Sequence, residues 1–518
     1  MAITIRPWQF CLQRSVASAW SVMAVTLMLP HRAGAAEWAF VPTLLLRESY
    51  SDNIRLEPPP LAKSELTTEI TPGFNLSRDS ARLTLNVGYS LQKILYTDEP
   101  DRLNHQLQGA GHALLLDDWL FADARASISQ QNVSAFGPQL IDNTQITGNQ
   151  TTVRGYLFSP YLKHDLRGFA ATELRYTHES VSSGGSAGLS TDTNEIRLNL
   201  TGDNGGRGAN WDANFDRRKI DDHARPPVLM SSEALTLHYP IGSTISVFGT
   251  GGYEKDDYAT SDSAQPAGRF WSAGAAWNPS TRTSVVASVG KRFFGNTYSL
   301  DTSYRSHNTV WSLTYGEDIT TAYGQFLAVS RNDTSALLNQ LWLSSIPDPV
   351  ARQQSIDAFI LLAPFFGPNA GAINYISHQY FLDKRLSLSM ALSGPRTTLA
   401  LSLTRLQRTA QSSTNIDNPL LGTNQLALDD KTRQSNASAA WSWRLSGRSN
   451  LHLTTTYSSV DSLATGRTDK NEGLGAGLSH QLSSKVSANV ELHHANHSSN
   501  TGGNYRENGV SAALNFQF

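Results

Sequence analysis

The sequence predicts an all-β protein, a transmembrane antiparallel outer-membrane β-barrel of about 22 strands, within a range of roughly 18 to 24. Three observations lead to this fold class. Apolar and polar residues alternate with a period of two along most of the chain. The connections between these stretches alternate between short and long. The chain ends on an alternating stretch whose last residue is Phe518.

The composition argues against other classes of protein. Charged residues make up 17% and hydrophobic residues 39% of the chain, both less than in ordinary soluble domains. The counts of 19 Phe, 17 Tyr and 11 Trp are too high for a disordered chain. The formal net charge of -2 offers no basic surface, so no nucleic-acid partner is expected.

The N-terminus predicts a cleaved signal peptide over residues 1–36. Arg6 and Arg14 provide the positive region, and Val16–Leu29 is a mostly apolar segment. The small residues Ala33-Gly34-Ala35 then provide a cleavage site. We therefore expect an exported protein.

The rest of the chain, 37–518, is expected to form the barrel. No run of 18 apolar residues follows the signal peptide, so no membrane helix is expected. The single cysteine, Cys11, lies in the signal peptide, and no disulfide is expected. Because the first alternating stretch starts soon after the cleavage site, no N-terminal plug domain is expected.

The alternation assigns each stretch a lipid face and a luminal face. In a barrel, apolar residues face the lipid and polar residues face the interior. The expected lipid-facing positions of one stretch are Leu83, Leu85, Val87 and Leu91, and its expected luminal positions are Arg82, Thr84 and Asn86.

The alternating stretches and the turn residues between them place the strands. Short connections are typical of periplasmic turns and long ones of external loops, which puts both termini on the periplasmic side. The external turn at Phe294–Thr297 is unusually tight for this scheme. The strands are expected at 38–50, 66–78, 82–96, 103–116, 119–132, 151–163, 166–180, 193–201, 207–221, 231–240, 243–255, 268–278, 282–294, 297–306, 308–320, 376–393, 397–409, 433–446, 449–460, 470–482, 485–496 and 505–518.

The segment 321–375 is too long for a loop without structure of its own. Asp348-Pro349 has the residue types of a helix start, an N-cap followed by proline, and predicts a helix to about Leu362. We expect a long, partly helical loop. Two interpretations stay open, an external helical loop and an inward-folded lid.

The last stretch indicates a partner in assembly. It resembles the terminal strand by which the bacterial barrel-assembly machinery selects its clients, and membrane lipid is the other expected partner. One face carries Val510, Ala512, Leu514, Phe516 and Phe518, and the other carries Ser511, Asn515 and Gln517.

The sequence contains patterns that resemble catalytic and metal-binding motifs, but none of them meets the structural requirements of such a site. Gly184–Gly188 matches a nucleophile elbow, but it lacks the buried strand and the helix that this chemistry needs. His493, His494 and His497 cannot share one metal ion on a strand, because neighbouring residues point to opposite faces. We therefore predict no catalytic, cofactor or metal site and no enzymatic activity.

Two further groups of residues are expected near strand ends. The acidic group is interpreted as solvated or as binding ions and head groups at the rim: Asp216, Asp221, Asp222, Asp256 and Asp257. The aromatic group is interpreted as an interfacial belt, with a sugar-stacking track in the lumen as the alternative: Trp119, Tyr156, Tyr161, Tyr239, Trp277, Trp441 and Trp443.

Several segments resemble the outer-membrane proteins associated with the PEP-CTERM/exosortase system, a family encoded in exopolysaccharide loci. The resemblance implies a role in making or exporting an extracellular polysaccharide, and it implies no site residue. It extends over most of the mature chain and is weakest at 321–375. The matching segments are Arg47–Ile54, Thr71–Gly73, Leu115–Phe121, Ser129–Val133, Gly268–Gly295 and Tyr304–Ser306.

Three functions are compatible with the sequence. The first is a conduit or accessory pore for exopolysaccharide, with the polysaccharide and periplasmic export components as partners. The second is a general or solute-selective porin, which shares every feature above. The third is a barrel enzyme acting on lipid or polysaccharide, for which no residue set is found.

Overall fold

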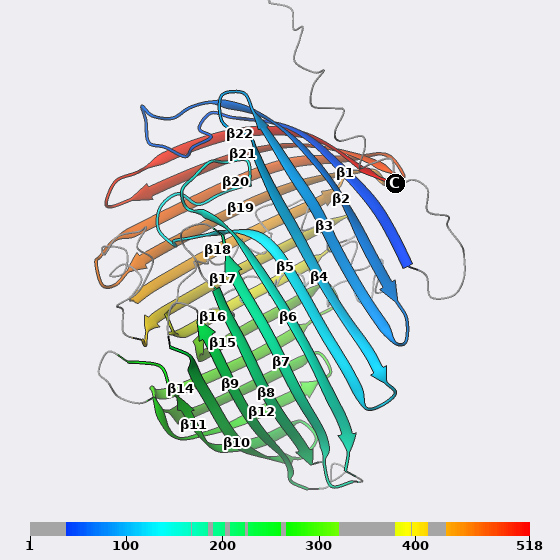
Figure 1. The fold of residues 1–518 in the computed structure, drawn as a ribbon, viewed down its shortest axis with the longest axis vertical. Coiled ribbons are helices and arrows are strands. Elements are labelled where there is room, and N and C mark those ends of the chain that lie inside the picture. The colour runs from blue at the N-terminus through cyan, green and yellow to red at the C-terminus, as the bar shows by residue number, and fades with distance from the viewer. Residues whose placement is uncertain are drawn as a thin grey trace, which may run out of the picture.

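The computed structural model describes residues 38–166, 168–184, 190–202, 208–222, 226–260, 266–320, 379–394, 396–412 and 431–518. Within these ranges the chain forms a 22-stranded antiparallel sheet in which each strand pairs with its neighbours in the sequence. The last strand returns to pair with the first, from Thr43↔Gln517 to Ser51↔Gly509. The sheet is therefore a closed barrel, and Figure 1 shows the blue first strand beside the red last strand.

Most strands are 12 to 16 residues long, enough to cross a bilayer with a tilt and to extend beyond it. They are β1 (Trp38–Ser51), β2 (Glu65–Asp79), β3 (Leu83–Tyr96), β4 (Arg102–Leu116), β5 (Leu120–Asn132), β6 (Gln150–Asp165), β7 (Ala171–Ser183), β8 (Ser190–Gly202), β9 (Asn210–Asp222), β10 (Val228–Ile241), β11 (Ile245–Asp256), β12 (Ala267–Ser280), β13 (Thr283–Arg292), β14 (Gly295–Arg305), β15 (Thr309–Thr320), β16 (Phe381–Ser393), β17 (Thr397–Ala410), β18 (Lys431–Arg444), β19 (Ser449–Ser462), β20 (Thr468–Ser483), β21 (Val486–Ser499) and β22 (Tyr505–Gln517).

The structure confirms the predicted strand number and the antiparallel barrel. The tight external turn is real, since only Phe293 and Phe294 separate β13 from β14. The expected start of β7 at Leu166 is wrong. The Leu166 backbone amide donates to the carbonyl of Ala170, so this stretch closes a turn instead of extending the strand. The expected start of β16 at 376 is also early, because the strand begins at Phe381.

Some predictions concern residues outside the described ranges. The signal peptide at 1–36 is one of them, and with it the expectation of a barrel without a plug. The partly helical segment 321–375 is another, as are residues 185–188 of the glycine-rich stretch. No helix among the described residues is long and apolar enough to cross a membrane.

Connections after even-numbered strands hold two to seven residues, whereas five of the eleven connections after odd-numbered strands hold ten or more. By the rule for outer-membrane barrels, the short connections are periplasmic and the long ones external. The outer surface agrees with a bilayer position. Exposed aromatic side chains form one girdle at the external strand ends and a second at the periplasmic ends. The external girdle includes Tyr50, Tyr253, Trp271, Tyr298 and Tyr457, and the periplasmic girdle includes Trp38, Tyr239, Trp277, Tyr304, Trp311 and Trp443.

The alternation along β3 has the expected orientation. Gln92 points into the barrel, where its side chain accepts a hydrogen bond from Asn104 at 3.2 Å. Thr84 and Asn86 have the same parity as Gln92 and share its luminal face. Leu85 and Val87 have the opposite parity and face the lipid.

Several luminal glycines lie directly opposite aromatic rings on the neighbouring strand. Gly274 is paired with Phe248, and a Cβ built on it would lie 2.4 Å from that ring and 2.4 Å from the Ala287 carbonyl oxygen. Gly252 is opposite Phe270 in the same way. The ring covers the surface that the glycine leaves bare.

Candidate functional site: the barrel lumen

Ion-paired side chains cover one wall of the lumen, from β5 to β13, which we call the charged wall. On β8 and β9, Arg218 donates to the carboxylate of Glu195 at 2.9 Å. Arg197 contacts the same carboxylate and lies 3.4 Å from Asp216. These residues are paired across the two strands, so they share one face.

The charged wall continues toward both strand ends. Near the periplasmic side, Arg175 on β7 donates to Asp123 at 2.7 Å and to Glu173 at 2.9 Å. Near the external side, Arg292 on β13 donates to Glu254 on β11 at 2.8 Å. The Arg175–Asp123 and Arg292–Glu254 contacts each skip over an intervening strand, as the concave inner surface of a barrel allows.

The opposite wall is largely neutral. Because 22 strands close the ring, β18 and β19 lie half-way round the barrel from β7 and β8. The luminal side chains of β18 and β19 are short hydroxyls, amides and one imidazole, buried from solvent: Thr432, Gln434, Asn436, Ser438, His452 and Thr454. The lumen thus presents ion pairs on one side and uncharged hydrogen-bonding groups on the other.

External loop 133–149, between β5 and β6, folds into the barrel mouth. Its backbone reaches the far side, where the Gly137 amide donates to Asp469 on β20 at 2.8 Å. The Gln139 amide approaches the Tyr505 hydroxyl on β22 at 3.4 Å. The loop therefore bridges strands that are far apart around the ring.

The near side of loop 133–149 is held by β3 and β4. Tyr96 donates its hydroxyl hydrogen to the Thr144 carbonyl at 2.6 Å. Arg102 donates to the Gln145 carbonyl at 3.0 Å, and Asn143 donates to Gln92 at 3.3 Å.

Apolar contacts add to these hydrogen bonds. Phe136 is buried against Phe381 on β16 and Val460 on β19. At the other end of the loop, Ile146 packs on the cluster of Ile54 and Ile94. Burial of a phenylalanine side chain contributes about 1.5–3 kcal/mol. Apolar burial therefore adds to the hydrogen bonds in stabilising the inward position of the loop.

The neck of the loop is closed by one side chain. Asn149 accepts a hydrogen bond from the Ser134 amide at 2.7 Å. Its amide group donates to the carbonyls of Ser134 and Pro138, both at 3.0 Å. This three-way contact holds the two ends of the loop together.

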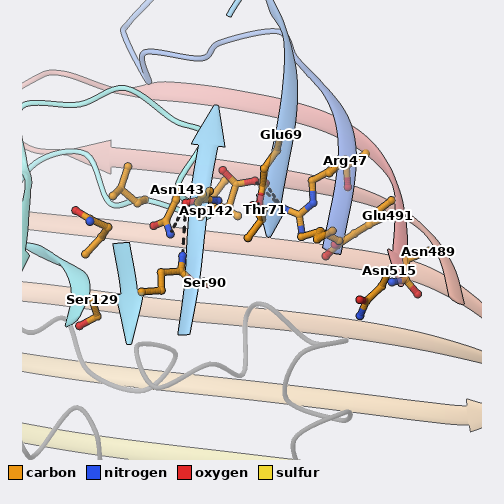
Figure 2. A pocket seen from close by; sticks show the side chains of 18 of the residues that line it. Arg47, Glu69, Thr71, Ser90, Ser129, Asp142, Asn143, Asn489, Glu491 and Asn515 are labelled. Carbon is orange, nitrogen blue, oxygen red and sulfur yellow. Dashed lines mark hydrogen bonds and ion pairs between the residues drawn. The ribbon is translucent and has the colours of Figure 1, made fainter. Parts of the chain in front are cut away.

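Beneath the loop lies a chamber of about 1170 Å³. Amide and hydroxyl side chains dominate its lining, with Ser90, Ser129, Asn489 and Asn515 among them. Four of its charged members, Arg47, Glu69, Asp142 and Glu491, lie near one another (Figure 2).

A neighbouring external loop is tied down by an ion pair outside the membrane. Arg55 donates two hydrogen bonds to Glu99, at 2.8 and 2.7 Å. The Arg55 guanidinium holds the pKa of the Glu99 carboxyl below its ordinary value. The pair joins the loop after β1 to the loop after β3.

The three histidines considered as metal ligands are separated by the fold. His493 faces inward, 3.0 Å from a Glu507 carboxylate oxygen. His494 lies on the outer face and contacts Asn508 at 2.8 Å. His497 is luminal and stacks on the Tyr505 ring at 4.9 Å. No group of three potential metal ligands occurs among the described residues.

The acidic candidates do not form one rim site. Asp216 belongs to the charged wall. Asp222 and Asp256 are buried at the external ends of β9 and β11. Asp221 has the opposite parity on β9, and Asp257 lies in the loop after β11. The structure therefore distributes these residues between the two faces.

The belt interpretation is right for most of the aromatic residues and wrong for Tyr161. Trp441 and Trp443 lie together on the outer face near the periplasmic end of β18, with rings 5.9 Å apart. Tyr156, Tyr239, Trp277 and Trp119 are exposed. Tyr161 is buried in the lumen, stacked on Phe121 at 5.1 Å and under Arg175 at 3.8 Å.

Two features of the site were not predicted from the sequence. The inward path of loop 133–149 depends on contacts with strands hundreds of residues away, such as Gly137 with Asp469. The division into a charged and a neutral wall becomes visible only when the charges of each luminal face are compared strand by strand. The two walls could have been predicted by asking which charged residues occupy the same even or odd positions as the luminal residues of each predicted strand.

No family model and no curated protein matches the sequence. Solved structures give distant likenesses. The siderophore receptor PirA from Pseudomonas aeruginosa is 11% identical with a TM-score of 0.46, over 94% of this chain and 81% of that one. The FrpB iron transporter from Neisseria meningitidis is 8% identical with a TM-score of 0.49, over 92% and 81%. The outer membrane protein OpdK from Pseudomonas aeruginosa is 9% identical with a TM-score of 0.36, over 93% and 99%.

Proposed function

We propose that this outer-membrane barrel is a conduit or accessory pore for exopolysaccharide export in a PEP-CTERM/exosortase-associated system. The observation that carries the proposal is the chamber of about 1170 Å³, lined mainly by amide and hydroxyl side chains. Such groups exchange hydrogen bonds with sugar hydroxyls.

The neutral wall supports the same substrate class. A polymer in the chamber meets Asn436, Asn450 and Thr456 of β18 and β19, all of them uncharged. On the opposite side, the ion pairs of the charged wall satisfy one another and leave few isolated charges. The resemblance to proteins of exopolysaccharide loci supports the polymer in particular.

A deletion strain tests the proposal. We expect loss of surface polysaccharide, restored by the intact gene and not by a variant whose barrel fails to assemble. Heat-modifiable migration on gels identifies the assembled barrel. Normal surface polysaccharide together with loss of small-solute uptake would contradict the export function.

A solute-selective porin is the second candidate, and loop 133–149 favours it. A loop anchored at both sides of the mouth narrows the passage, which suits small solutes better than a polymer. Uptake of radiolabelled sugars into proteoliposomes separates the two functions. A porin admits monosaccharides and disaccharides at rates that depend on their size.

A further inference from the structure

A cluster of carboxylates faces a single guanidinium where loop 133–149 crosses the lumen. Asp142 in the loop has a carboxylate oxygen 4.0 Å from Arg47 Nη1. Glu69 on β2 has one 3.7 Å from the same nitrogen. Glu491 on β21 points into the chamber beside Arg47 (Figure 2). Two carboxylates thus share one guanidinium, and a third lies beside it.

The Glu69 side chain is nearly buried and lines the chamber. Its side chain is only 4% exposed, and its Oε1 accepts a hydrogen bond from Thr71 at 2.7 Å. Its Oε2 has no hydrogen-bond donor, although the residue lines the chamber. Arg47 at 3.7 Å is too distant to hydrogen-bond to it, so the charge of this oxygen is only partly compensated.

Other buried polar atoms also face the chamber without a hydrogen-bond partner. Asn436 and His452 are each 7% exposed and line the chamber, and neither the Asn436 amide nitrogen nor the His452 ring nitrogens is hydrogen-bonded. Polar atoms in this state are unusual in protein interiors. Inside an aqueous chamber, water or a passing molecule can hydrogen-bond to these atoms.

The other charged side chains of the described lumen do not make the net charge around the constriction positive. The second cation of the chamber, Arg448, lies in a periplasmic turn at the other end of the barrel. On the charged wall, Asp123, Glu173, Glu179, Glu195 and Asp216 outnumber Arg175, Arg197 and Arg218. At its external end, Glu254, Asp256 and Asp318 outnumber Arg292. Beside loop 133–149, Arg102 and Arg467 add two cations, and Glu65, Asp469 and Glu507 add three carboxylates. Negative charge therefore prevails around the constriction, among the residues that the structure describes.

We infer that this constriction selects cations over anions, with Glu69, Asp142 and Glu491 as the selectivity-determining residues. Carboxylates lining a pore favour cation passage because they replace part of the hydration of a cation and repel anions. The inference rests on the proposed function only in requiring a conducting lumen, and it applies to an exporter and to a porin alike.

The experiment measures reversal potentials of the purified full-length barrel in planar bilayers under a KCl gradient. We expect potassium to be several-fold more permeant than chloride. The triple variant E69Q/D142N/E491Q keeps the shapes and removes the charges, and its permeability ratio should fall to near unity. R47Q removes the opposing cation, and its ratio should rise above that of the wild type.

A matched control is available on the same strand. Glu48 adjoins Arg47 in sequence but lies on the lipid face, where it accepts a hydrogen bond from Thr68 at 2.8 Å. E48Q removes the same charge outside the lumen and should leave the ratio unchanged. The single variant D142N, in the loop, provides the test if the triple variant does not assemble.

The outcomes separate the inference from the function on which it rests. Channels that are unselective or anion-selective would contradict the inference but not the proposed pore function. Cation selectivity that survives in the triple variant and in D142N also overturns it. A folded barrel that never conducts overturns the proposed pore and the inference together.

Discussion

At the scale of single residues, the side of the strand decides what a substitution does. Val87 and Asn86 are neighbours in β3, yet Val87 faces lipid and Asn86 faces the lumen. A lysine on the lipid face near the bilayer midplane costs about 2–4 kcal/mol, and a luminal lysine costs little. We expect Val87→Lys to lower the free energy of unfolding by that amount and Asn86→Lys to leave it nearly unchanged. Urea unfolding in lipid vesicles measures both, and equal effects would show that the assigned faces are wrong.

A second residue-scale prediction concerns Gly274. A Cβ there would meet both the Phe248 ring and the Ala287 carbonyl oxygen at 2.4 Å, and the backbone oxygen cannot move aside cheaply. We expect Gly274→Ala to destabilise the barrel by about 1–3 kcal/mol, the usual cost of overpacking. Gly249 on β11 is the control, since a Cβ there has no neighbour within 4 Å. A Gly274→Ala variant as stable as Gly249→Ala would contradict the close approach.

At the scale of elements, loop 133–149 is the one whose position matters most for passage. Replacing 134–148 with a short Gly/Ser bridge removes the contacts with β20 and β22 and leaves β5 and β6 joined. We expect a several-fold rise in single-channel conductance with normal assembly, because the mouth loses its crossing segment. Asn149→Ala, which opens only the neck of the loop, should have a smaller effect in the same direction. Unchanged conductance in the deletion would mean that the constriction lies elsewhere.

The last strand is expected to act as an assembly signal. Val510 and Leu514 in β22 and Phe518 directly after it are exposed, so the apolar stripe that a receptor would bind is intact in the fold. We propose that the barrel-assembly machinery reads this stripe. Polar substitution of Phe516 and Phe518 should leave unfolded protein in the periplasm, seen as loss of the heat-modifiable form. Normal amounts of inserted barrel in the double variant would exclude this role.

The elements also show how far the sequence alone could lead. Period-two alternation is a local property, and it located all 22 strands because lipid on one side and polar lumen on the other impose it on every strand. Where local chemistry was ambiguous, the boundaries moved, as at Leu166, whose turn is set by a hydrogen bond to Ala170. The path of loop 133–149 was out of reach, because Phe136 finds its partners on β16 and β19, far along the chain.

At the scale of the whole molecule, closure of the ring is the property on which every luminal argument depends. Ser49 on β1 and Ser511 on β22 are directly paired and both face the lumen. Directly opposite residues in antiparallel strands have Cα atoms about 4.5–5.5 Å apart, within the range that a disulfide can bridge. The sequence has a single cysteine, Cys11, so an introduced pair of cysteines has at most one competitor.

We therefore expect the double variant Ser49→Cys/Ser511→Cys to form a disulfide on oxidation only after the barrel has assembled. The product is a nearly circular chain, which migrates faster than the linear chain on non-reducing gels after heat denaturation. Ser49→Cys/Asn515→Cys is the control. Asn515 is paired with Leu45, four residues along the strand from Ser49, which places the two cysteines about 13 Å apart and beyond disulfide range. Efficient cross-linking of the control, or none in the paired variant, would show that β1 and β22 do not meet in this register and that the lumen is not closed as described.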